Sequence, residues 1–385
     1  MFANRTNWDL TTNRLSDALT AFRKSGRKLL DLAASNPTEC GFHYDGSSIL
    51  KALINANALK YHPDPRGLLS ARAAIVDYYV QRGQRLAADD LLLTTSTSEG
   101  YSFLFRLLCN GGDEVLIPTP GYPLFDFLAD LQDVKLVRYP LFYDHGWHID
   151  FHALEQAITA RTRAIIVVHP NNPTGHFTKA EEISRLNQIC LARGLAIVAD
   201  EVFLDFPLAG LEPLSFSGNA ETLTFTMSGL SKIAGLPQMK LGWIVASGPN
   251  PEKSQALARL EMIADTFLSV STPIQVAAPT LLAQRYNFSS QLMARVRSNL
   301  QEFDRQLNEQ RSCNRLLVEA GWYAVLRVPA TNSDEDLALS LLQDDDVYVH
   351  PGLFYDFAGQ GNLVLSLITP ERDFSEGLEK LLARF

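Results

Sequence analysis

Short apolar runs alternate with amphipathic stretches between about residues 91 and 247. Each run is four to eight residues long and ends in turn-forming residues, a pattern typical of buried strands and not of helices. The predicted strands lie near 91–95, 114–118, 134–139, 163–168, 195–199, 222–226 and 242–247. Because amphipathic segments separate them, we expect a mainly parallel sheet with helices on both faces, a three-layer α/β arrangement.

The rest of the chain predicts a second, smaller α/β unit. Long helices are expected over 252–267 and from 288 to about 311. Residues 319–385 then read as a strand, a helix, two short strands and a helix. We find no internal repeat and no low-complexity linker. The sequence therefore favours a large domain over 46–280 and a small domain that contains 281–385.

Composition limits the possible partners and locations. At 385 residues the chain is long enough for two cores, and its net charge of −9 without a basic run argues against nucleic acid as a partner. The cysteines are scattered without CxxC spacing, which indicates a reducing compartment: Cys40, Cys109, Cys190 and Cys313. No stretch resembles a signal peptide or a membrane span, so we expect a cytoplasmic protein.

Nucleotide and metal sites have little support. The sequence contains neither GxGxxG nor a Walker loop, and 344–346, three successive aspartates, is interpreted as a solvated loop because it lacks further ligands at a known spacing. We therefore expect no metal.

The segment 228–243, SGLSKIAGLPQMKLGW, carries two lysines and no other charge. Burial disfavours the ammonium form, so a desolvated Lys232 could lose its proton and attack an aldehyde to form a Schiff base. Lys240, eight positions later, could remain charged and bind an anion. The alternative is a surface loop on which both lysines lay their stems over apolar neighbours.

Two upstream motifs favour the chemical interpretation. The apolar run 164–168 is followed by HPNNPTG, which contains Asn172, and the run 195–199 ends at Asp200 in DEVF. Ligands of open α/β sheets bind at the carboxyl ends of the strands, where both residues would lie. Taken singly, the first motif could be an ordinary turn and Asp200 an ordinary turn or helix cap.

The chain resembles the class I/II aminotransferases of the fold-type I pyridoxal-phosphate enzymes. The resemblance rests on the order and spacing of three residues, Asn172, Asp200 and Lys232. That family carries N-P-T-G, then D-E-x-Y, then S-x-S-K with a basic residue eight places later. The resemblance implies an aspartate-aminotransferase-like fold in which residues 1–45 join the small domain. It also implies a homodimeric aminotransferase that uses pyridoxal 5'-phosphate to move an amino group from an amino acid to a 2-oxo acid.

The resemblance assigns roles around the cofactor ring. Asp200 would face the pyridine nitrogen and keep it protonated, so that the ring can withdraw electrons. Lys232 would hold the cofactor as a Schiff base and later move the substrate proton. Asn172 would donate to the ring oxygen, and Tyr122, in PTPGYP, would stack on the ring. A core aromatic in a proline-rich turn is the alternative for Tyr122.

The resemblance also implies a phosphate site. Ser96 and Thr97 would lie at a helix N-terminus, where free amides favour an anion, although plain N-capping explains the same residues. Ser231 and Lys240 match two further phosphate contacts, with Lys240 where the family more often has arginine. Tyr61 matches a tyrosine that reaches the phosphate of the neighbouring subunit, which implies a shared active site.

Two positions depart from the family pattern. Phe203 replaces the tyrosine of D-E-x-Y and cannot donate to the ring oxygen. Val364 falls where the family has the arginine that binds the substrate carboxylate. Arg327 is one candidate replacement, although a surface arginine on a strand is the alternative, and Asn36, in SNP, is the other candidate substrate contact.

Both departures keep a second reaction class open, a lyase or decarboxylase on the same fold. The same lysine, aspartate and asparagine serve all these reactions. A non-enzymatic regulator would need a DNA-binding domain, for which the 45 residues before the large domain are too few and too weakly basic.

Overall fold

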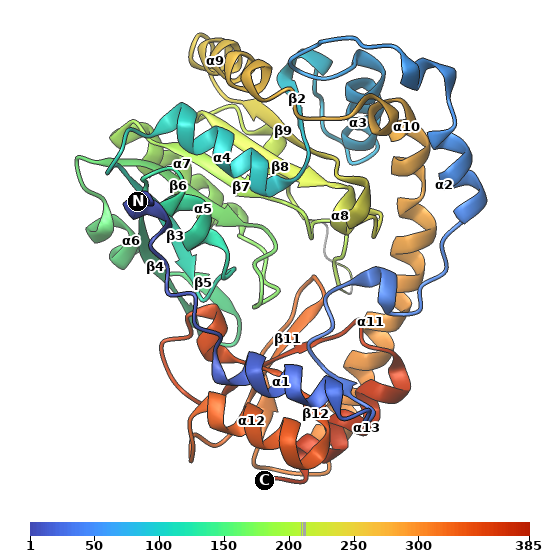
Figure 1. The fold of residues 1–385 in the computed structure, drawn as a ribbon. Helices are drawn as coiled ribbons and strands as arrows, with labels where there is room; N and C mark the ends of the chain where they lie inside the picture. Colours follow the sequence, from blue (N-terminus) through green and yellow to red (C-terminus); the bar gives the residue numbers. More distant parts are fainter. Residues whose placement is uncertain (209, 211–212) are drawn as a thin grey trace.

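The computed structural model describes residues 1–208, 210 and 213–385. Within them, an eight-stranded sheet has the order β2-β9-β8-β7-β6-β3-β4-β5 and forms the centre of the upper body in Figure 1. Its strands are β2 (Leu91–Thr94), β3 (Glu114–Thr119), β4 (Lys135–Tyr143), β5 (Trp147–Ile149), β6 (Thr162–Val168), β7 (Ala196–Asp200), β8 (Thr224–Gly229) and β9 (Gly242–Ser247). The pairs from β8 to β4 are parallel, whereas β2, β9 and β5 pair antiparallel.

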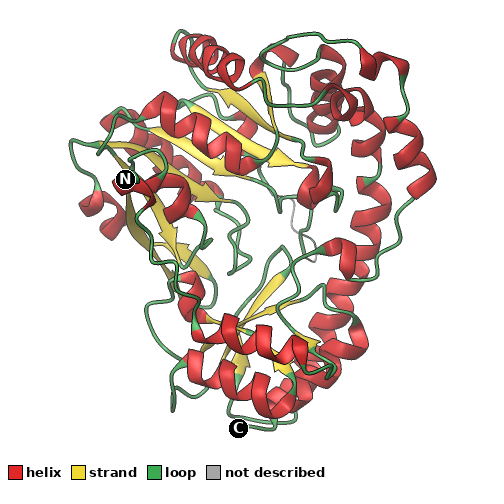
Figure 2. Ribbon diagram, viewed as in Figure 1, coloured by secondary structure: helices red, strands yellow, loops and turns green. Residues whose placement is uncertain are grey.

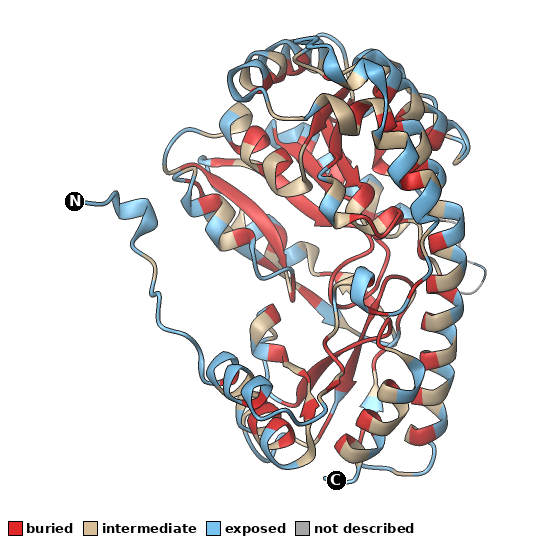
Figure 3. Ribbon diagram, turned by 45° about the vertical axis from the view of Figure 1, so that its right-hand side comes forward, coloured by how far each residue is buried: buried red, intermediate tan, exposed pale blue. Residues whose placement is uncertain are grey.

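Helices cover both faces of this sheet, as Figure 2 shows. Neighbouring residues of the central strands point to opposite faces, so Ile166 and Ile165 belong to two different apolar clusters. One cluster includes α4 (Thr97–Leu108), α5 (Phe125–Asp130) and α9 (Glu252–Phe267); the opposite cluster includes α6 (Phe151–Ala157) and α7 (Ala180–Arg193). The strands are buried on both faces (Figure 3), which explains their nearly continuous apolar sequence.

A third cluster packs helices against β2 and β9. It contains residues of α2 (Gly46–Leu53), α3 (Leu69–Val80), α8 (Leu230–Ile233) and α10 (Thr272–Ala283). Trp243 is fully buried there, and its indole nitrogen donates to the Tyr79 hydroxyl at 3.1 Å. This cluster fixes the short helix α8, which carries Lys232.

The lower body in Figure 1 contains a four-stranded sheet of order β10-β11-β14-β13. Its elements, with the two-stranded sheet beside it, are β10 (Asn314–Arg315), β11 (Tyr323–Arg327), β13 (His350–Pro351), β14 (Asn362–Ser366), β1 (Leu30–Asp31) and β12 (Val347–Tyr348). The helices are α1 (Arg14–Lys24), α11 (Arg285–Leu307), α12 (Asp334–Asp345) and α13 (Glu371–Leu382). The long α11 runs from the upper to the lower body (Figure 1).

The N-terminal segment contacts both bodies. β1 pairs in parallel with β12, and Leu15 of α1 belongs to the apolar cluster of the lower body. The first residues instead contact the upper body: the Trp8 indole donates to Asp130 at 2.9 Å and its ring meets Phe127 edge-on. The division into 46–280 and 1–45 plus 281–385 remains our proposed domain division.

Element bounds differ from the sequence prediction where side chains give a weak signal. The helix 252–267 is found as predicted, whereas β4 runs on to Tyr143 and pairs with the unpredicted β5. The helix expected from 288 begins at Arg285 and ends at Leu307, and the C-terminal unit has three strands after α12 instead of two. Among the described residues, no helix combines the length and the apolar character that crossing a membrane requires.

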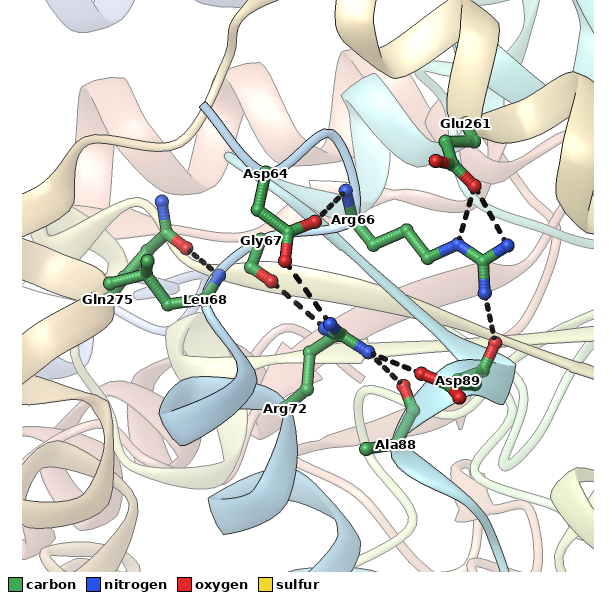
Figure 4. A network of polar contacts seen from close by, with 9 residues as sticks. All are labelled: Asp64, Arg66, Gly67, Leu68, Arg72, Ala88, Asp89, Glu261 and Gln275. Atoms are coloured by element: carbon green, nitrogen blue, oxygen red, sulfur yellow. Dashed lines mark hydrogen bonds and ion pairs between the residues drawn. The ribbon is translucent and has the colours of Figure 1, made fainter. Parts of the chain in front are cut away.

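The loop before α3 is held by a buried guanidinium (Figure 4). Arg72 is 6% exposed and donates to the Gly67 carbonyl at 2.9 Å, the Ala88 carbonyl at 2.7 Å and the Asp64 carboxylate at 3.3 Å. The neighbouring Arg66 is more exposed and bonds Glu261 at 2.9 Å. Since the loop begins at Tyr61, Arg72 fixes the segment that presents this tyrosine.

We expect Arg72→Met to destabilise the protein by about 2–4 kcal/mol, because backbone carbonyls and a carboxylate lose a charged donor. Arg66→Met is the matched control, and its partly exposed ion pair should contribute about 1 kcal/mol or less. The free energy of unfolding in urea measures both. Equal decreases in the free energy of unfolding of the two variants would contradict a special stabilising role for Arg72.

Candidate active site

A cavity of about 300 Å³ opens between the carboxyl ends of the central strands and the small sheet. It is lined by residues of both bodies: Ser35, Thr97, Ser98, Tyr101, Tyr122, Pro123, Leu124, Phe125, Leu128, Val168, Asn172, Asp200, Val202, Phe203, Lys232, Tyr323, His350 and Tyr355. Six of the predicted site residues are therefore brought together here: Thr97, Tyr122, Asn172, Asp200, Phe203 and Lys232.

Lys232 lies in the one-turn helix α8, directly after β8. Its Nζ is 4.9 Å from the centre of the Trp322 ring and 5.7 Å from that of Phe203, so aromatic faces replace water around the amine. Burial lowers the pKa of Lys232 to about 8, and the charge of Asp200 opposes that shift. A substantial fraction of the amine is therefore neutral near pH 8.

Asp200 is the last residue of β7 and is 8% exposed. It accepts hydrogen bonds from the Val202 amide at 3.2 Å and the Tyr101 hydroxyl at 3.0 Å. Burial raises its pKa to about 6, while these two bonds and Lys232 act in the opposite direction. At neutral pH and above, Asp200 is mainly a carboxylate that faces the cavity.

The remaining ring contacts fit the expected cofactor. Asn172 follows β6, and its buried Oδ1 has no hydrogen-bond partner among the described residues. The ring of Tyr122 forms part of the cavity wall and meets Phe125 edge-on at 5.8 Å. The Lys232 amine, the Asp200 carboxylate, the Asn172 side-chain amide and an aromatic wall surround one cavity, and pyridoxal phosphate requires an amine, a carboxylate and an amide donor of this kind.

Helix α4 directs its N-terminus at the same cavity, because Thr97 and Ser98 of its first turn line the wall. The first amides of a helix lack intrahelical acceptors and attract anions. Ser96 is the N-cap, and its Oγ accepts from the Glu99 amide at 3.2 Å. The Ser96 hydroxyl therefore caps the helix, the alternative that the sequence left open, whereas the backbone of the turn is suited to a phosphate.

Besides Ser96, three further predicted phosphate contacts do not line the cavity. Ser231 precedes Lys232 in α8 and is partly exposed. Lys240 is exposed on the following loop, with a left-handed backbone at φ 51°. Tyr61 is 73% exposed and lines a separate small pocket with Gln275. Their assignment stays a prediction.

Phe203 has a packing role that its sequence position did not reveal. It is 4% exposed and meets Trp322 edge-on at 5.2 Å and Tyr323 at 6.2 Å. A phenyl ring at this position therefore joins the large domain to the small sheet beside Lys232.

The two predicted substrate contacts lie outside the cavity. Arg327, at the far end of β11, is exposed, and its guanidinium lies 5.7 Å from the centre of the Tyr143 ring. This position fits the alternative, a surface arginine, and the assignment of Arg327 to the substrate stays a prediction. Asn36 caps a short 3-10 helix by accepting from the Thr38 amide at 3.1 Å, while its neighbour Ser35 reaches the cavity.

Several cavity residues were not singled out from the sequence. Tyr101, Tyr323 and Tyr355 had no motif, because their positions depend on long-range packing. His350 directly precedes Pro351 and Gly352, and this neighbouring proline-glycine pair is its only signal in the sequence. Trp322, which borders the Lys232 amine, is fully buried and reads in the sequence as an ordinary core residue.

Comparisons with known proteins point to one family. A family model described as aminotransferase class I and II matches residues 27–381. The glutamate-pyruvate aminotransferase AlaA of Escherichia coli strain K12 is 33% identical over 261 residues, which are 67% of this chain and 64% of that protein. The match thus spans just under two thirds of that relative's length.

Longer matches are less identical. An alanine aminotransferase of Mycobacterium bovis is 29% identical over 369 residues, 92% of this chain and 85% of that protein. The crystal structure of an aminotransferase from Escherichia coli covers 100% of this chain and 98% of its own, with a TM-score of 0.88 and 26% identity.

We expect the rate at which Lys232 in the cofactor-free protein reacts with an amine-acylating reagent to rise with pH and to reach its midpoint near pH 8. The reason is the lowered pKa of Lys232, because the neutral amine is the reactive form. Ordinary lysines titrate near pH 10.4. Peptide mass spectrometry across a pH series measures the reaction at each lysine. In Asp200→Asn the midpoint should fall further, since the opposing negative charge is gone. A Lys232 midpoint near 10 in the natural protein would contradict the desolvated environment.

Proposed function

The chain belongs to the class I and II aminotransferases, a pyridoxal-phosphate-dependent family, and we propose that it moves an amino group from an amino acid to a 2-oxo acid. The observation that carries the proposal is one cavity that holds the Lys232 amine, the Asp200 carboxylate and the Asn172 side-chain amide. The named relatives support glutamate and alanine as the first amino donors to test.

Each residue has a proposed role toward the cofactor. Bound pyridoxal phosphate supplies an aldehyde that links to amines and a ring that withdraws electrons from the bond being broken. Lys232 would hold the cofactor through its amine and, when that amine is free, would move the proton of the substrate carbon as general base and acid. Asp200 keeps the ring nitrogen protonated, Asn172 donates to the ring oxygen, and Tyr122 packs on the ring.

The phosphate is proposed to lie at the N-terminus of α4. The amides of Thr97 and Ser98 and the helix dipole favour a dianion there. Lys240 and Ser231 are proposed as additional contacts. Lys240 offers a mobile point charge on a long stem, so it can reach the anion from an exposed backbone position.

Tyr61 supports a homodimer as part of the proposal. Its side chain is exposed on a loop that Arg72 holds, and it lines no part of the cavity of its own chain. Leu50, Ile54 and Leu59, just before it, are between 61% and 91% exposed. Contiguous apolar exposure of this kind is typical of an interface, which we propose joins two copies and brings Tyr61 to the partner's phosphate.

Two finer points remain proposals. A cytoplasmic location is supported by four free cysteines, of which three are buried. A lyase or decarboxylase would use the same Lys232, Asp200 and Asn172, and it is distinguished by its product: transamination leaves the cofactor in its amino form and releases an oxo product, whereas decarboxylation releases carbon dioxide.

We expect Lys232→Ala to lose at least about 100-fold in transamination rate, because the general base and the attachment point are both removed. Borohydride reduction of the natural holoenzyme should fix the cofactor on the peptide that contains Lys232, and peptide mapping identifies it. Lys240→Ala is the control, which should retain the fixed cofactor. A label on another lysine would refute the assignment.

We expect Tyr61→Ala and Lys232→Ala, each weakly active or inactive, to recover activity when they are refolded together. A mixed dimer would have one site with Lys232 from one chain and Tyr61 from the other. Differently tagged chains allow the mixed dimer to be purified and assayed. A purified mixed dimer without activity above the parent variants would rule out a shared site.

A further inference from the structure

One face of the small sheet forms a wall of the cavity. Val364 of β14 lies directly opposite His350 of β13 and Val325 of β11. Opposite residues of antiparallel strands share a face, and Tyr323 lies two residues from Val325 on that same face. Because His350 and Tyr323 both line the cavity, position 364 belongs to the wall behind it.

The polar groups of this wall are neutral. The Nδ1 of His350 lies 3.0 Å from the Tyr355 hydroxyl, and burial lowers the pKa of His350 to about 4. Burial raises the pKa of the Tyr323 and Tyr355 hydroxyls, so both stay protonated at neutral pH. The wall therefore offers hydrogen-bonding groups without a positive charge.

Lys232 is the only lysine or arginine among the described residues that line the cavity, and its amine is assigned to the cofactor. Arg138 lies beyond Tyr355 but is occupied by two carboxylates, Asp356 at 2.8 Å and Asp126 at 2.9 Å. A carboxylate placed against this wall would lose water without gaining a charged partner, which is unfavourable. An uncharged group would not incur this cost.

Apart from the polar residues Ser35, Thr97, Ser98 and Asn172 and the Lys232 and Asp200 pair, the rest of the cavity surface is apolar and aromatic. Tyr122, Leu124, Phe125 and Leu128 line it from the large domain, and Val202 and Phe203 complete it near Asp200. Flat or bulky apolar groups gain contact area on such a surface.

We propose that this site recognises its amino substrate without a charged partner for a carboxylate. Primary amines and amino-acid amides with an aromatic or bulky apolar body would then be substrates on a par with the corresponding amino acids. The inference rests on the proposed transamination.

The donor loses its amino group and one hydrogen from the same carbon and becomes an aldehyde or ketone. The 2-oxo acid gains both and gives up its oxygen, so no further oxidant is needed.

A binding experiment tests recognition apart from turnover. Calorimetry on the holoenzyme compares 3-phenylpropanoate with 3-phenylpropanamide, which have the same shape and differ in charge. We expect the carboxylate to bind less than tenfold more tightly than the amide, or more weakly. A preference of tenfold or more for the carboxylate would overturn the proposal.

Val364→Arg provides the matched gain of charge. A guanidinium on this face should raise the preference for 3-phenylpropanoate over the amide by at least about 10-fold, the value of one charge-assisted contact. Val364→Met, similar in bulk and uncharged, should leave the preference as in the natural protein. If the arginine variant is folded by circular dichroism and the preference is unchanged, the placement of this wall is wrong. If the arginine variant does not fold, the preference of the natural holoenzyme between the carboxylate and the amide tests the proposal by itself.

Measured turnover distinguishes a failure of the proposed substrate recognition from a failure of the proposed transamination. L-phenylalanine, L-phenylalaninamide and 2-phenylethylamine are each mixed with the holoenzyme, and conversion of the cofactor to its amino form is followed by absorbance. Rates within about tenfold of one another support the proposal. Conversion by the amino acid alone overturns it and leaves transamination intact, whereas conversion by no donor, alanine and glutamate included, refutes the proposed function.

Discussion

The burial of two opposite charges at one site, Lys232 and Asp200, is the constraint on which the rest of the structure depends. Desolvation alone would favour the neutral form of each side chain, and their mutual attraction only partly offsets this effect. Asp200 is held by the Val202 amide and the Tyr101 hydroxyl, and Lys232 by a helix of one turn that a buried cluster fixes. The surrounding structure therefore holds both side chains at a site that is less hydrated than water, although desolvation disfavours the charged form of each.

The loop between β6 and α7 shows how tightly the two bodies are joined around this pair. Gly175 accepts from the Glu319 amide at 3.0 Å and the Ala320 amide at 2.8 Å, and its own φ is +68°. A Cβ at Gly175 would come within 2.6 Å of the Ala320 carbonyl oxygen. Lys179 forms an ion pair with Glu319 a few residues away. The glycine of the HPNNPTG motif is thus explained by close approach to the small domain, and Asn172 is fixed three residues before that contact.

The sequence predicted the central strands and six of the residues that line the cavity because both depend on local signals. Runs such as 164–168 are apolar on both faces, and the polar residues that follow them necessarily meet at one edge of a parallel sheet. β5 was missed because its three residues are too few to show an alternating pattern of apolar and polar positions. An isolated arginine such as Arg327 gives no local signal of where its side chain points. The aromatic wall was not predictable either, since Tyr101, Tyr323 and Tyr355 come from distant segments that meet only through tertiary packing.

The two bodies contribute different kinds of residue to the cavity. The large domain supplies the groups for chemistry, whereas Tyr323, His350 and Tyr355 of the small domain form the opposite wall. That wall is tied to the large domain by the Gly121 amide, which donates to the Tyr355 carbonyl at 3.0 Å, and by Arg138, which bonds Asp356. A substitution on the small sheet can therefore change which molecule fits without altering the Lys232 and Asp200 environment. We propose that valine in place of the family's arginine at position 364 is a change of this kind, because it leaves the wall formed by the small sheet without a positive charge and leaves the Lys232 and Asp200 pair with its supports in place.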